Sequence, residues 1–173
     1  MNDPRIAMLV GPGFEDLEHW AVYMRMKELG GRIRILGTVA GETYTSKHGG
    51  LTATAEKAAS EVTAEEFDAV LVPGGWAPDK LRRDQGVLRL VRDAHAGGLI
   101  LGFICHAGWV AASAGIVKGM SVTGSGGIRD DMVNAGATWS DVPALRDGNT
   151  VWGRVVEDIP DYNRELARAL GER

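Results

Sequence analysis

The stretch that decides the fold is Leu99-Ile-Leu-Gly-Phe-Ile-Cys-His-Ala-Gly108. Residues 99–104 have the length and apolar composition of a buried β-strand, and the small residues that follow indicate a helix. A nucleophile between such a strand and helix stands in a sharp turn, with its side chain exposed above the sheet. Small residues must follow it because the backbone is crowded there, and Ala107 and Gly108 meet this requirement. The stretch therefore predicts a turn that presents Cys105.

Cys105 has two interpretations at this point. As a nucleophile, its thiolate lies over the N-terminus of the next helix, whose partial positive charge lowers a cysteine pKa, and His106 can accept the proton. As a structural residue, it is a buried, inert thiol, which is the usual fate of a lone cysteine. It is the only cysteine of the chain, so neither an intrachain disulfide nor a multi-cysteine zinc site is expected. A single thiol and an N-terminus without a signal-peptide layout predict a cytoplasmic protein.

Strand-like and helix-like segments alternate on both sides of this stretch. Strands are expected over 6–10, 33–36 and 68–72, hairpins over 44–55 and 144–151, and helices over 14–29, 87–95, 106–114, 128–135 and 162–170. In the first helix, apolar residues follow helical spacing at Leu17, Trp20, Ala21 and Met24. This rhythm builds a parallel sheet with helices on both faces. We therefore expect one α/β domain over residues 1–173, a flavodoxin-like three-layer sandwich with a mainly parallel sheet.

Charge and hydropathy exclude two classes of partner. The 173 residues include 19 basic and 23 acidic side chains, a net charge of −4, and no Lys/Arg cluster that could grip a phosphate backbone. Residues 99–117 approach the length of a membrane span, but Gly102, Gly108 and Gly115 interrupt them. We expect neither a nucleic-acid partner nor a membrane segment.

A cofactor is not expected either. Gly11-Pro12-Gly13 resembles half of a dinucleotide fingerprint, but Asp16 takes the third glycine position, and Glu15, Asp16 and Glu18 would repel a pyrophosphate. The chain has no GxxxxGK[ST], HExxH or GxSxG pattern. We therefore predict no cofactor and no metal.

Three turns of the predicted fold meet at one edge of the sheet. The strands over 6–10, 68–72 and 99–104 would all end there, which brings Glu18, Gly74-Gly75 and Cys105 together. The acids have a simpler alternative, because carboxylates in a first helical turn complement the helix dipole, and this interpretation suffices for Asp16. The convergence of three turns favours a functional site.

Six motifs in this order resemble the ThiJ/PfpI superfamily, and within it the PfpI-type intracellular cysteine proteases. They are FEDLE (14–18), SKHG (46–49), FDAVLVPGG (67–75), APD (77–79), ICHAG (104–108) and GIRDDMVNAGA (127–137). The resemblance implies a class I glutamine amidotransferase-like fold with Cys105 as the nucleophile and His106 as the family histidine. It also implies that Glu18 hydrogen-bonds to the cysteine, and that the backbone N–H groups of Gly75 and His106 form an oxyanion hole. The triad acid, which PfpI-type members take from a neighbouring subunit, falls on Asp79.

Other positions match less closely. Glu15 is the second acid near the thiol, and Lys47 matches a site-proximal lysine. Asp79 is one methylene shorter than the family's glutamate, Ser125 stands where a tyrosine is usual, and Ala107-Gly108 replaces Gly-Pro. Each of Trp76, Trp109 and Trp152 either joins an aromatic lining of the site or has a plain packing role. The remaining histidines are expected on loops or the surface (His19 and His48) or in a structural role (His95).

The resemblance implies three activities that share a first step, thiolate attack on an electrophilic carbon: intracellular protease, glyoxalase III and protein deglycase. We place small reactive aldehydes ahead of peptides, because peptide hydrolysis needs a proton donor for the amine and only His106 is placed to supply it. A non-enzymatic alternative is a redox sensor or holding chaperone in which Cys105 oxidises to a sulfinate. A cofactor-binding module is a weaker third possibility. A homodimer or a larger homo-oligomer is expected.

Overall fold

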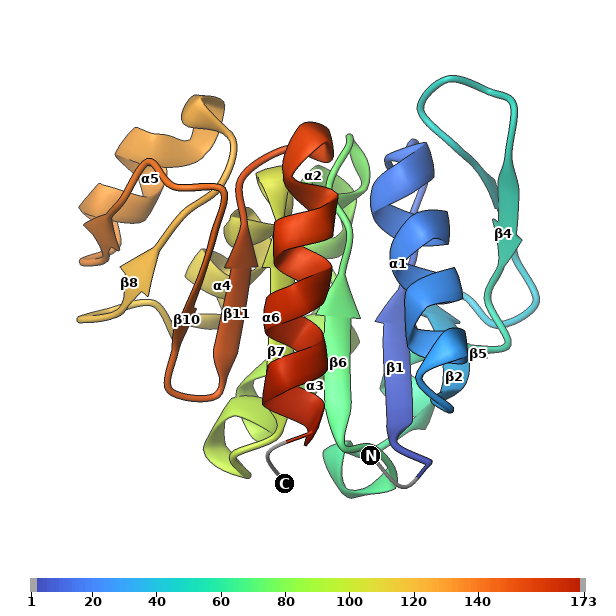
Figure 1. Cartoon of the computed structure of the whole chain (residues 1–173). Helices are drawn as coiled ribbons and strands as arrows, with labels where there is room; N and C mark the ends of the chain where they lie inside the picture. The colour runs from blue at the N-terminus through green and yellow to red at the C-terminus, as the bar shows by residue number, and fades with distance from the viewer. Residues whose placement is uncertain (1–2, 172–173) are drawn as a thin grey trace.

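A seven-stranded sheet forms the centre of the protein, which a computed structural model describes over residues 3–171 (Figure 1). Its strand order is β10-β11-β7-β6-β1-β2-β5, and every neighbouring pair is parallel except β10 with β11. The strands are β1 (Arg5–Leu9), β2 (Arg32–Gly37), β5 (Lys57–Ala58), β6 (Ala69–Val72), β7 (Ile100–Ile104), β10 (Ala144–Asp147) and β11 (Thr150–Gly153). The predicted mainly parallel sheet is confirmed.

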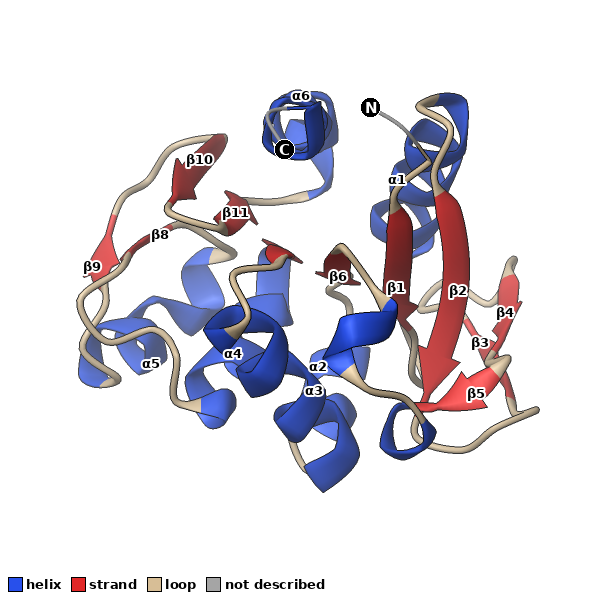
Figure 2. Cartoon of the chain, turned by 90° about the horizontal axis from the view of Figure 1, so that it is seen from below, coloured by secondary structure: helices blue, strands red, loops and turns tan. Residues whose placement is uncertain are grey.

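Helices cover both faces of this sheet, as Figure 2 shows in a view from below. One face carries α1 (Asp16–Glu28) and α6 (Ile159–Gly171), and the other carries α2 (Ala77–Leu81), α3 (Gln85–Ala96), α4 (Gly108–Ala114) and α5 (Arg129–Asn134). The arrangement is the predicted flavodoxin-like α/β sandwich of three layers.

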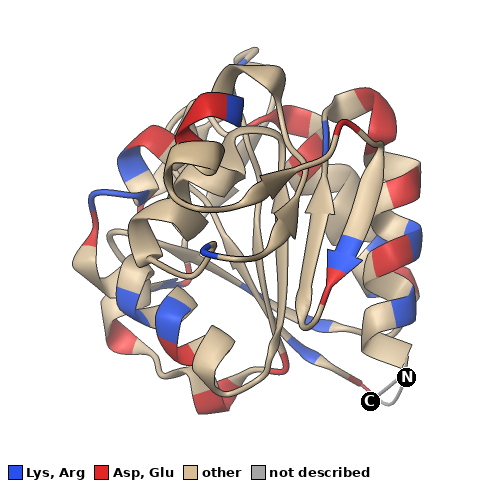
Figure 3. Ribbon diagram, turned by 90° about the vertical axis from the view of Figure 1, so that its left-hand side faces the viewer, with Lys and Arg blue, Asp and Glu red and all other residues tan. Residues whose placement is uncertain are grey.

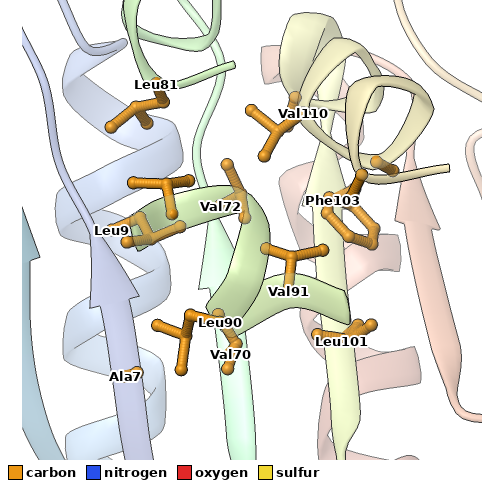
Figure 4. Close-up of a cluster of buried hydrophobic side chains, with 14 of the residues drawn as sticks. Ala7, Leu9, Val70, Val72, Leu81, Leu90, Val91, Leu101, Phe103 and Val110 are labelled. Carbon is orange, nitrogen blue, oxygen red and sulfur yellow. The ribbon is translucent and has the colours of Figure 1, made fainter. Parts of the chain in front are cut away.

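Alternate residues of each central strand point to opposite layers, so the core consists of two clusters. Leu9, Val72 and Phe103 pack beneath α3 and α4, with further side chains shown in Figure 4. Their strand neighbours Met8 and Leu71 pack against α1 and α6. Strands buried on both faces read as continuous apolar runs, and this is why they were recognisable in the sequence.

Helix α1 turns a different side inward from the one that its apolar spacing predicts. Leu17 and Met24 are exposed, whereas Val22 and Met26 are buried against the sheet. His19, expected on a loop or the surface, lies inside the helix and is fully buried, so that prediction is wrong. Apolar residues occupy several sides of α1, and spacing alone therefore does not identify the buried side.

Small elements complete the molecule. The hairpin β3 (Thr43–Thr45) and β4 (Thr52–Thr54) projects beside the sheet (Figure 1), and the exposed His48 lies in its turn, as predicted. A short parallel pair, β8 (Ser121–Val122) with β9 (Thr138–Trp139), was not predicted, and neither were β5 and α2.

The surface carries interspersed charges of both signs (Figure 3). On α6, for example, Arg164 pairs with Asp161 and Arg168 pairs with Glu165. Among the described residues, no helix combines the length and the apolar character needed to cross a membrane. Residues 99–117 contain the buried strand β7, a turn and the seven-residue helix α4.

Candidate active site

A pocket of about 970 Å³ opens at the edge where the parallel strands end. All nine residues that the sequence singled out for the site lie in its wall. They are Glu15, Glu18, Lys47, Gly75, Asp79, Cys105, His106, Trp109 and Ser125. The parallel sheet therefore brings together segments that are about 90 residues apart in the chain.

Cys105 occupies the turn between β7 and a 3-10 turn, Cys105–Ala107, that leads into α4. Its backbone has a φ of 60°, in the left-handed region that residues other than glycine rarely adopt. The side chain is half-buried and lines the pocket. The sharp strand-to-helix turn predicted for Cys105 is present.

His106 is in direct contact with the thiol. Its Nδ1 lies 3.2 Å from Sγ of Cys105, and its ring packs edge to face against Trp109 with centroids 5.1 Å apart. Partial burial and the positive charge of Lys47 lower the pKa of His106, which favours the neutral imidazole. A neutral ring nitrogen at this distance can accept the thiol proton.

Glu18 reaches the thiol from α1. It is only 1% exposed, and its Oε2 accepts a hydrogen bond of 2.7 Å from the backbone N–H of Gly74. Burial, reinforced by the charge of Glu15, raises the pKa of Glu18 to about 7, while the hydrogen bonds to Gly74 and to the Cys105 side chain work in the opposite direction. A Cβ at Gly74 would lie 2.4 Å from Oε2, so the approach of Glu18 requires glycine there.

The thiol itself does not have the lowered pKa that its place before a helix predicts. Burial and the negative charge of Glu18 raise the pKa of Cys105 to about 12, although backbone N–H groups of His106 and Gly75 hydrogen-bond to the sulfur and oppose the rise. The prediction is wrong because desolvation beside an acid outweighs two N–H dipoles. A protonated Glu18 would remove the repulsive part of this effect.

A tight backbone contact places Gly75 beside the sulfur. Gly75, with φ of 78°, forms an isolated antiparallel bridge with Phe14. The N–H of Glu15 donates to the carbonyl of Gly74 at 3.1 Å, and the N–H of Trp76 donates to the carbonyl of Gly13 at 2.8 Å. These bonds hold the Gly74-Gly75 turn against the start of α1, and so against Cys105.

The two other acids at the start of α1 are used structurally. Glu15 caps the helix, with Oε2 accepting from the N–H groups of Leu17 and Glu18 at 2.8 Å. Asp16 accepts from Ser46 Oγ at 2.6 Å and contacts His48 Nδ1 at 2.9 Å. Glu15, Asp16 and His48 lie close enough to share a metal ion, but these contacts already satisfy them. The helix-terminus interpretation of these acids thus holds for Glu15.

Asp79 lies across the pocket on α2. Its carboxylate binds the guanidinium of Arg83 at 2.7 Å and approaches Lys80 at 3.6 Å. Within residues 3–171 of one chain it makes no hydrogen bond to His106, so its predicted role from a neighbouring subunit stays a prediction.

Two other predicted residues, Ser125 and Lys47, are held at the site by backbone hydrogen bonds. The backbone N–H of Ser125 donates to the carbonyl of Cys105 at 3.2 Å, and that of Lys47 donates to the carbonyl of Phe14 at 2.8 Å. Both bonds tie separate segments to the site.

Of the tryptophans considered for an aromatic lining, Trp76 and Trp109 line the pocket, whereas Trp152 is buried in the core. Part of the wall was not predicted: the segment after β11, with Val155, Val156 and Glu157, and the exposed Leu17 and Lys80. The sequence predicted the hairpin over 144–151 but not the strand that it pairs with. Because its second strand pairs in parallel with β7, the residues after it must emerge at the same edge as Cys105.

Comparison with known proteins gives concordant results. The model of the DJ-1/PfpI family matches residues 4–169. A deglycase from Pyrococcus abyssi is 36% identical over 96% of this chain and 99% of its own length. Protein/nucleic acid deglycase 2 of Escherichia coli is 35% identical over 96% and 98%. A solved two-domain protein from Anabaena variabilis, with DJ-1/ThiJ/PfpI-like and ferritin-like domains, superposes with a TM-score of 0.96 at 33% identity, covering 98% of this chain and 48% of that one.

Proposed function

Because the chain belongs to the DJ-1/PfpI family, as the six sequence motifs predict, we propose that it is an enzyme that attacks a carbonyl through Cys105. The observation that carries the proposal is the contact of 3.2 Å between the sulfur and His106 Nδ1, inside a pocket that a substrate can enter. Relatives named deglycases support reactive carbonyls and their adducts on amines as the substrate class. We place small reactive aldehydes ahead of peptides as the substrate.

The first step follows from the positions of the groups. The sulfur forms a bond to the carbonyl carbon while the thiol proton passes to Nδ1 of His106, which suits a thiol with a raised pKa. The developing oxyanion receives hydrogen bonds from the N–H groups that already face the sulfur, those of Gly75 and His106. Return of the proton from His106 to this oxygen leaves a neutral thiohemiacetal.

Glu18 controls the charge at the sulfur. When protonated, its carboxyl can donate to the sulfur as negative charge develops, whereas an ionised carboxylate would repel that charge. Its raised pKa of about 7 keeps a large fraction protonated at neutral pH. We assign it the role of stabilising the thiolate, with Glu15 helping to keep it protonated.

The test compares wild type with Cys105→Ser on methylglyoxal, a methylglyoxal-modified lysine peptide, a modified guanosine nucleotide and a fluorogenic peptide. We expect wild type to consume methylglyoxal or to release it from the modified peptide, and Cys105→Ser to lose about 10⁴-fold or more of that rate. Wild type alkylated with iodoacetamide is the matched control and should behave like the variant. Equal rates in wild type and Cys105→Ser would refute the proposal.

The same assay separates the alternatives. Cleavage of the fluorogenic peptide alone would make the protein a peptidase. No turnover, together with peroxide-dependent protection of an unfolding client protein, would favour the redox sensor or holding chaperone. Activity on the nucleotide would contradict the expectation, drawn from the lack of a basic cluster, that nucleic acid is not a partner.

Three further expectations belong to this proposal. The working unit is a homodimer or larger homo-oligomer in which Asp79 reaches the partner's site. Residues 1–173 form one domain, and the family match over residues 4–169 supports this. The enzyme acts in the cytoplasm, as its single free thiol suggests.

A further inference from the structure

The imidazole ring of His106 must be held in place, and within residues 3–171 the only hydrogen bond of the ring is the contact with Cys105. A histidine side chain turns about two bonds, so Nδ1 stays at the sulfur only if the surroundings block other rotamers. On one side lies the backbone of Gly127, where an added Cβ would be 3.4 Å from Nε2. On another lies the indole of Trp109, with ring centroids 5.1 Å apart.

Trp109 is placed against His106 by its spacing. His106 lies in the turn that leads into α4, and Trp109, three residues later, lies in the first turn of α4; side chains at this spacing share one face of a helix. Their rings meet at 67°, the edge-to-face arrangement that aromatic pairs favour.

The indole is fixed from two other elements. Its Nε1–H donates to Oδ2 of Asp131 on α5 at 2.7 Å. The guanidinium of Arg82, at the end of α2, lies 5.5 Å from its ring centre, within the range of a cation–π contact. Nε of Arg82 donates in turn to Oγ of Ser113 on α4 at 2.9 Å. A tryptophan that only filled space would need none of these polar contacts.

We propose that Trp109, held by Asp131 and Arg82, is a positioning residue that keeps Nδ1 of His106 at the sulfur of Cys105. The clamp of Trp109, Asp131 and Arg82 lies entirely within one chain. It therefore orients the histidine before any acid arrives from a partner subunit. The orientation stands on the geometry alone, and only its effect on turnover rests on the proposed function.

The indole of Trp109 also covers part of the imidazole. Burial lowers the pKa of His106, and the groups that face the ring are Lys47 and Cys105, with Glu18 beyond the sulfur. Removal of the indole admits water, so the pKa of His106 should rise toward its ordinary value of about 6.5.

The test measures the rate of Cys105 alkylation by iodoacetamide against pH, together with kcat and KM for methylglyoxal. The variants are Trp109→Leu, Trp109→Phe and Asp131→Ala, with Trp139→Leu as the matched control because Trp139 lies on β9 outside the pocket. In the plot of alkylation rate against pH, the inflection that disappears in His106→Ala is the one that reports the titration of His106.

We expect Trp109→Leu to raise this inflection and to lower kcat about 10- to 100-fold at an unchanged KM, because a misplaced base loses general-base catalysis rather than substrate binding. Trp109→Phe keeps a ring but no N–H, and it should fall between Trp109→Leu and wild type. Asp131→Ala, a surface change, should shift the inflection in the same direction by less. If Trp109→Leu does not fold, the shifts in Trp109→Phe and Asp131→Ala test the proposal.

The proposal is overturned if the inflection in the Trp109 and Asp131 variants matches that of wild type, or if Trp139→Leu moves it equally. Failure of the proposed function is distinguishable, because it shows in the turnover of Cys105→Ser, while alkylation needs no turnover.

Discussion

The buried histidine His19 makes a measurable contribution to how stability depends on pH. It is fully buried in α1 between Phe14 and Trp20, with ring centroids 4.9 and 5.0 Å away. Neither of its ring nitrogens has a hydrogen-bond partner among the described residues. Burial lowers the pKa of His19 from 6.5 to about 4, because the imidazolium would have no water around it. Replacing it by leucine, a good helix former of similar volume, removes the titrating group.

The magnitude follows from the two pKa values. As the pH falls below 6.5, the unfolded chain takes up a proton that the folded chain refuses until about pH 4, so acid favours unfolding. The linked loss of unfolding free energy is about 0.2 kcal/mol at pH 7, about 1.4 kcal/mol at pH 5.5 and about 3 kcal/mol at pH 4. His19→Leu should therefore gain about 3 kcal/mol on wild type between pH 7 and pH 4, whatever its constant packing effect.

Urea unfolding of both proteins at pH 7, 6, 5 and 4 measures this difference. Only the slope of the difference against pH is used, because lost ring contacts and the removal of two unsatisfied nitrogens shift all points equally. His48→Leu, on the exposed hairpin turn, removes a histidine that is accessible to water and contacts Asp16, and it should not reproduce the gain of His19→Leu. A difference that stays constant from pH 7 to pH 4 would show that His19 is hydrated or partnered in the folded protein, and the reasoning would fail.

Three other predictions concern the site and the sheet. Glu18 shows the opposite trend to His19, because its pKa is raised from 4.5 to about 7 and the free energy of unfolding falls as the pH rises between these values. In the same unfolding experiment, Glu18→Gln should gain about 3 kcal/mol on wild type from pH 4 to pH 8. Asp79→Ala and Cys105→Ser should each be inactive on methylglyoxal, and mixing them should restore part of the activity if one chain completes the other's site; a mixture as inactive as its components would argue against the shared site. Gly102→Ala should lower the melting temperature, since a Cβ there would lie 2.4 Å from the Tyr162 hydroxyl, whereas Gly50→Ala, with open space around it, should leave it unchanged.

Sequence reasoning succeeded where the pattern is local or follows from topology. The apolar run before Cys105 and the small residues after it are consecutive, so the turn between them is legible in ten residues. The meeting of Glu18, Gly74 and Cys105 then follows from one rule, that parallel strands end at the same edge. The structure brings these residues together as that rule predicts.

It failed where the outcome depends on what surrounds a residue. The raised pKa of Cys105 comes from burial beside Glu18, and neither the burial nor the distance is written in the spacing. His19 is buried and Leu17 is exposed, the reverse of the prediction, because α1 has apolar residues on several sides. The pocket wall at Glu157 needed the non-local pairing of β11 with β7. Elements of two residues, such as β5, are too short to leave a periodic signal.

The left-handed backbone at Cys105 makes the stability of the fold and the presence of a thiol at this position compete. Holding a residue with a Cβ in this conformation costs about 1–3 kcal/mol, which the rest of the sheet must offset. Glycine adopts the same conformation freely. Replacing Cys105 by glycine would therefore remove this cost and stabilise the fold, but it would also remove the only thiol of the chain. The cysteine in this turn therefore supplies a reactive group at a cost in backbone stability.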